Sequence, residues 1–91
     1  MISQSVNVTE PTEVGPWKIP EDSSSVSIFI NPSKRVRVTV EVAPRLQVGA
    51  NQFWVKIGET KTDSFYKTVD NVGFVRFTTT GAADIAVVSN R

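Results

Sequence analysis

The stretch "KRVRVTVEV", residues Lys34–Val42, decides the fold class because valine occupies every second position from residue 36 onward. A period of two is typical of a β-strand, whereas a helix would scatter these valines around its circumference. β-Branched side chains also fit a pleated, half-buried surface. The pattern therefore predicts a strand with one apolar side and one charged side. The apolar side is formed by Val36, Val38, Val40 and Val42.

Short segments in which apolar and polar residues alternate recur along the chain and predict an all-β protein. About eight short strands with turn residues between them are typical of an antiparallel β-sandwich, either immunoglobulin-like or jelly-roll-like, with no long helix. A length of 91 residues suits one domain over residues 1–91, in which residues 1–13 could form an extended N-terminal arm. Besides 34–42, the predicted strands are 5–9, 15–19, 25–30, 53–57, 64–69, 73–80 and 84–88.

Asp70 and Asn71 separate two of these strands, and both residue types tolerate positive φ. They predict a two-residue hairpin that pairs 64–69 with 73–80. In that register Phe65 lies opposite Arg76, and Lys67 lies opposite Phe74, on one mixed face. The aliphatic parts of the Lys67 and Arg76 side chains could cover the two rings, and this face would then be ordinary solvent-exposed surface. Alternatively, apolar groups rimmed by charge could form a contact site.

The turn after Ile30 raises a question of register. A four-residue loop would place Ile28 and Ile30 beside arginines, and a shift of one residue moves Ile28 onto the valine side. Either the loop has an odd length or the two strands belong to opposite sheets, and we favour the odd loop. Arg35, Arg37 and Glu41 then face outward. That side is either solvated, which discourages strand aggregation, or a polar interface patch.

The composition excludes several classes of function. The chain has no cysteine and no histidine, so thiolate zinc sites, disulfides and Ser–His–Asp or Cys–His machinery are absent. Its net charge is +1 without a basic run, which argues against nucleic-acid binding. No segment resembles a signal peptide or a membrane helix. We expect no catalytic residues, no metal and no cofactor, and hence not an enzyme.

The aromatic residues offer an alternative function. Trp54 is out of phase with Phe53, Val55 and Ile57, so we expect its ring to be exposed. Exposed aromatics on a β-sandwich can stack on sugars, as in a carbohydrate-binding module.

The C-terminal half contains "FWVKIGE" (53–59) and "GFVRFTTTGAADIAVVSN" (73–90). This succession of a Trp-bearing strand, a "VRF" strand, a Thr-Gly turn and an apolar closing strand resembles small β-sandwich proteins of tailed bacteriophages, some of which decorate the capsid. The resemblance implies a virion head or surface protein that is made in the host cytoplasm and forms a symmetric oligomer. It transfers no site residues.

These lines together predict a non-enzymatic structural protein that works by protein contact, with the capsid or a second copy as partner. Neither nucleic acid nor membrane is expected as a partner. A stable contact needs roughly 800 Å² per partner. The residues predicted to form it are Phe65, Lys67, Phe74, Arg76, Arg37 and Glu41.

Overall fold

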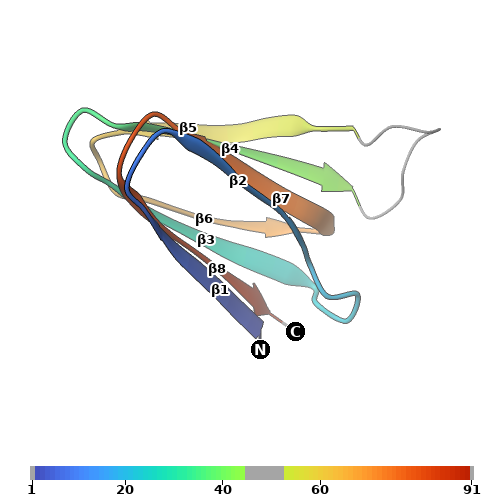
Figure 1. The fold of residues 1–91 in the computed structure, drawn as a ribbon. Helices are drawn as coiled ribbons and strands as arrows, with labels where there is room; N and C mark the ends of the chain where they lie inside the picture. The colour runs from blue at the N-terminus through green and yellow to red at the C-terminus, as the bar shows by residue number, and fades with distance from the viewer. Residues whose placement is uncertain (1, 45–52, 91) are drawn as a thin grey trace.

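The computed structural model describes residues 2–44 and 53–90 and confirms the all-β prediction. Eight antiparallel strands form two four-stranded sheets that face one another (Figure 1). No helix among the described residues is long and apolar enough to cross a membrane. The strands are β1 (Ile2–Val8), β2 (Thr12–Lys18), β3 (Ser25–Pro32), β4 (Arg37–Pro44), β5 (Val55–Lys61), β6 (Phe65–Asp70), β7 (Val72–Thr79) and β8 (Ala83–Asn90).

The strand order identifies the kind of sandwich. Sheet A has the order β1-β8-β3-β6, and sheet B has the order β2-β7-β4-β5. Four of the ladders pair strands as a nested set, β1 with β8, β2 with β7, β3 with β6 and β4 with β5. Two further ladders, β3–β8 and β4–β7, join these pairs into sheets. An eight-stranded double sheet of this kind is a jelly roll, one of the two forms expected from the sequence.

The predicted hairpin at Asp70-Asn71 is wrong, and so is the favoured odd-length hairpin loop after Ile30, because in both cases consecutive strands lie in opposite sheets. For the turn after Ile30 this is the second alternative that the sequence left open. Asn71, at φ 58°, turns the chain from β6 in sheet A to β7 in sheet B. Likewise β3 belongs to sheet A and β4 to sheet B, with Arg35 at φ 66° in the connection. Of the eight described strands, β4 and β5 are the one consecutive pair that shares a sheet.

Several strand limits also differ from the predicted ones. Pro32 lies at the end of β3, and Gly58 lies inside β5, so both strands extend beyond the ends predicted for them at residues 30 and 57. A register shift between Val40 and Glu41 in the β4–β5 ladder accommodates one extra residue of β5. Residues 2–8, part of the segment that could have formed an arm, pair along their whole length with β8.

The core lies between the sheets and confirms the valine pattern: Val38 and Val40 are fully buried, and Val36 and Val42 nearly so. Phe77 is the largest fully buried side chain, and Trp17 packs against it with ring centroids 5.6 Å apart. Such packing of apolar side chains is the main favourable term in folding. The core residues are Val8, Val14, Ile19, Val26, Ile28, Ile30, Val36, Val38, Val40, Val42, Val75, Phe77, Ala83, Ile85 and Val87.

Candidate functional site

Four of the six predicted contact residues share one surface. Arg37 and Glu41 on β4 alternate with buried valines, and Phe74 and Arg76 on β7 alternate with buried Val75 and Phe77. All four therefore point away from the core, on the outer face of sheet B. The ladders place Glu41 beside Arg76 and Ala43 beside Phe74. We call this outer face the charged face.

The centre of the charged face is a stack of three side chains. The Arg76 guanidinium lies over the Trp54 ring, with its carbon 4.1 Å from the ring centroid. Arg76 Nε also donates to Glu41 Oε1 at 3.0 Å, and both side chains are about a quarter exposed. A cation over an aromatic face and a hydrogen-bonded carboxylate fix the guanidinium from two sides.

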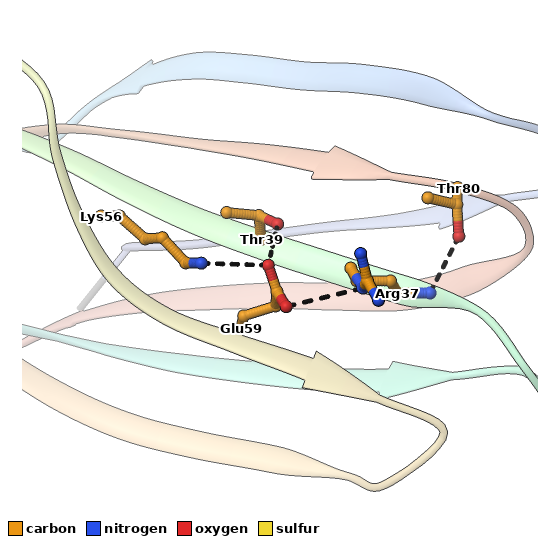
Figure 2. Close-up of polar contacts among 5 residues, drawn as sticks. All are labelled: Arg37, Thr39, Lys56, Glu59 and Thr80. Carbon is orange, nitrogen blue, oxygen red and sulfur yellow. Dashed lines mark hydrogen bonds and ion pairs between the residues drawn. The ribbon is translucent and has the colours of Figure 1, made fainter.

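A second charged group lies further along the same face, around Glu59 on β5 (Figure 2). Lys56 Nζ donates to Glu59 Oε2 at 3.0 Å, Thr39 Oγ1 donates to the same oxygen at 3.2 Å, and Arg37 Nε lies 3.5 Å from Oε1. The hydrogen bond from Lys56 is the main cause that lowers the pKa of the Glu59 carboxyl. The backbone amide of Arg37 is held by Thr80 Oγ1 at 2.9 Å.

The remaining two predicted residues, Phe65 and Lys67, are in β6 of sheet A, so the predicted mixed face does not exist. Phe65 is half-buried against the core, and Gly58 of β5 lies so close that a Cβ there would be 2.6 Å from the Phe65 ring. Lys67 Nζ donates to the carbonyl of Ile57 at 3.4 Å. Both residues therefore connect the edge strands β5 and β6 across the gap between the sheets.

Trp54 is only partly exposed, and Arg76 covers one face of its ring. A sugar would have to stack on the other face of this ring, so the role of Trp54 as a ligand aromatic stays a prediction.

The sequence analysis missed the outer face of sheet A. Phe29 is 43% exposed and Tyr66 is 62% exposed, and their ring centroids lie 4.8 Å apart. The signal was present, since Phe29 falls out of phase with Val26, Ile28 and Ile30. We call the outer face of sheet A the aromatic face.

The described residues contain no group of three or more aspartate or glutamate side chains placed to hold a metal ion. Likewise, no buried side-chain nitrogen or oxygen in this part of the chain lacks a hydrogen-bond partner.

No family model matches the chain, and no curated protein matches it. One solved structure that it resembles is that of Bacillus endospore appendages, described as a novel family of disulfide-linked pili. The superposition has a TM-score of 0.43 and 9% sequence identity, and it covers 99% of this chain and 88% of the other. The present sequence has no cysteine.

Proposed function

We propose that this protein is a non-enzymatic structural component of an assembled particle and that it binds another protein through the charged face. The observation that carries this proposal is the stack of Trp54, Arg76 and Glu41, with Phe74 two residues from Arg76 on the same strand face. Tryptophan and arginine are the residue types most enriched at the energetic centres of protein interfaces.

The surroundings of the stack support the same function. Glu59 and its partners Lys56 and Arg37 place charge of both signs around the aromatic and apolar centre. A rim of this kind excludes water and selects a partner with complementary charges. Because these side chains already hold one another, a partner would have less rotamer freedom to freeze on binding.

The size of the molecule sets the scale of the contact. A standard interface covers about 800 Å² on each partner, which is roughly one seventh of the 5444 Å² accessible surface of this chain.

The particle we propose is the head of a tailed bacteriophage, in which the protein would be a decoration or head component of the virion, made in the host cytoplasm. The support for this finer assignment is the resemblance of residues 53–59 and 73–90 to small phage β-sandwich proteins. Self-association into a homo-oligomer on the capsid lattice would use the same face.

The test is to replace Phe74 by Asp and to measure assembly by size-exclusion chromatography with light scattering, alone and with candidate head proteins. Phe74→Asp places a charge beside the stack and should abolish assembly. Thr68→Asp is the control, because Thr68 is exposed on β6 and pairs with Ser27 on the outer face of sheet A, which is the opposite side of the molecule. It should assemble as the wild type does.

Circular dichroism on both variants separates loss of contact from loss of fold. A folded Phe74→Asp protein that assembles normally would refute the charged face as the contact surface. If that variant unfolds, Arg76→Glu and Trp54→Ala provide the same test without touching Phe74.

A further inference from the structure

The aromatic face differs from the charged face in chemistry. Ser5, Ala86, Phe29 and Tyr66 lie opposite one another across all four strands of sheet A, so they form one row. None of the strand residues described on this face is a lysine or an arginine. The face therefore offers aromatic rings, polar groups and carboxylates, without the ion pairs of the charged face.

A second row lies two residues further along each strand, which is about 7 Å away. It places Asn7, Asp84 and Asn31 opposite one another. The Asn7 amide donates to the Asp84 carboxylate, and Ser64 Oγ donates to Asn31 Oδ1 at 2.9 Å. These contacts orient the polar groups while leaving further donor and acceptor positions on each of them.

Both rows line one hollow of about 570 Å³ on this face. Pockets that bind small ligands have volumes of roughly 300–1,000 Å³ and combine apolar walls with a few oriented polar groups. The aromatic row supplies the apolar wall, and the Asn7–Asp84–Asn31 row supplies the polar groups.

We propose that this hollow binds a neutral saccharide. A pyranose ring has an apolar face of C–H groups that would lie on Tyr66 and Phe29. Its equatorial hydroxyls would point outward from that stack, where the amides and the carboxylate can donate to and accept from them.

The charges on this face argue for a neutral ligand. Asp84 is the charged group in the hollow, and an acidic sugar or a phosphate would be repelled by it with no cation nearby among the lining residues. A flat protein partner would bury the polar row against its own surface, where each unmatched amide or carboxylate carries a desolvation cost. Sugar hydroxyls can match these groups individually.

This inference is independent of the proposed contact on the charged face. The aromatic face uses Phe29 and Tyr66, whereas the charged face uses Trp54 and Phe74, so variants can test the two faces separately. The test is a printed array of neutral and sialylated oligosaccharides probed with the full chain. Hits are then titrated by following backbone amide shifts in nuclear magnetic resonance spectra. We expect binding to neutral glycans, with shifts confined to β1, β3, β6 and β8, the strands of sheet A, and no binding to their sialylated counterparts.

Tyr66→Ala should weaken that binding by about tenfold, the loss expected for one aromatic contact. Trp54→Ala is the matched control, an aromatic deleted from the opposite face, and it should bind as the wild type does. Ala86→Arg provides a second variant that fills the hollow and leaves both rings in place, and it should abolish binding.

Three results would overturn the proposal. One is an array with no neutral glycan bound, and another is a sugar signal that Trp54→Ala removes and Tyr66→Ala leaves intact. The third is a wild-type oligomer that Tyr66→Ala dissociates, which would make the aromatic face a protein interface.

Discussion

The guanidinium of Arg76 lies 4.1 Å from the centre of the Trp54 ring and forms an ion pair with Glu41 at the same time. Arg76→Gln removes both interactions and leaves a partly buried carboxylate without its cation. We expect it to lower the free energy of unfolding by about 1–2 kcal/mol. Urea denaturation measures this loss, and the tryptophan emission should shift to the red as Trp54 becomes exposed. Arg37→Gln is the comparison, because the Arg37–Glu59 pair is more exposed and should contribute less to stability. Equal losses in both variants would contradict the importance of the stack.

Gly58 and Phe65 contact one another across the gap between the sheets. Gly58→Ala would bring a methyl carbon within 2.6 Å of the Phe65 ring, so the ring must leave its position against the core. We expect a loss of about 1–3 kcal/mol, as for other overpacked sites. Phe65→Leu makes room, so the double variant should lose less than the sum of the two single losses. Additive losses in this cycle would show that the two residues do not interact.

Tyr66 is the single tyrosine of the chain, so its ionisation can be followed directly by ultraviolet absorbance. Hydrogen bonding with Thr68, and secondly with Ser27, lowers its pKa below the ordinary value of 10.0. A lowered pKa in the folded state stabilises the fold, and this contribution is complete above the unfolded pKa and is lost as the pH falls through the folded pKa. Thr68→Val should raise the pKa of Tyr66 towards 10.0. An unchanged titration midpoint would mean that Thr68 does not stabilise the phenolate.

The Glu59 carboxyl, which lies at the surface beside Lys56, provides a second pH test. Its lowered pKa means that it stabilises the fold above the ordinary value of 4.5 and that this effect is lost as the pH falls through the folded value. Lys56→Met should therefore lower the melting temperature slightly near neutral pH and not at all in strong acid. Added salt should reduce the difference, because exposed charges are screened. A difference that grows on acidification would argue against this ion pair.

Local periodicity was sufficient to predict the strands. Val36, Val38, Val40 and Val42 alternate with polar residues, and all four are buried. Alternation depends on the pleat of one strand alone, so the sequence of that strand contains the necessary information. For the same reason Arg37 and Glu41 were correctly placed facing outward.

The pairing of strands could not be predicted in this way. Asn71 has the positive φ that its residue type suggested, but the same backbone conformation serves a hairpin and a corner between two sheets. Phe65 and Tyr66 put apolar groups on both sides of β6, so its own sequence did not show which side faced the core. The predicted contact between Phe65, Lys67, Phe74 and Arg76 failed because it depended on that hairpin.

The aromatic face was missed for a related reason. Phe29 and Tyr66 are 37 positions apart along the chain and become neighbours only through the β3–β6 ladder. Each looked like a single exposed ring, which is common on protein surfaces. Their juxtaposition is a property of the strand order.

The nested ladders have a kinetic consequence. In the outermost pair Ile2 meets Ser89, whereas in the innermost ladder Val42 meets Val55. Joining residues far apart in the chain costs more loop entropy than joining near ones, and topologies with distant pairings assemble slowly. Folding should therefore begin with the innermost pair, β4 with β5, and continue outward through the nested pairs to β1 with β8. The terminal strands β1 and β8, of which β1 is an edge strand of sheet A, would pair last.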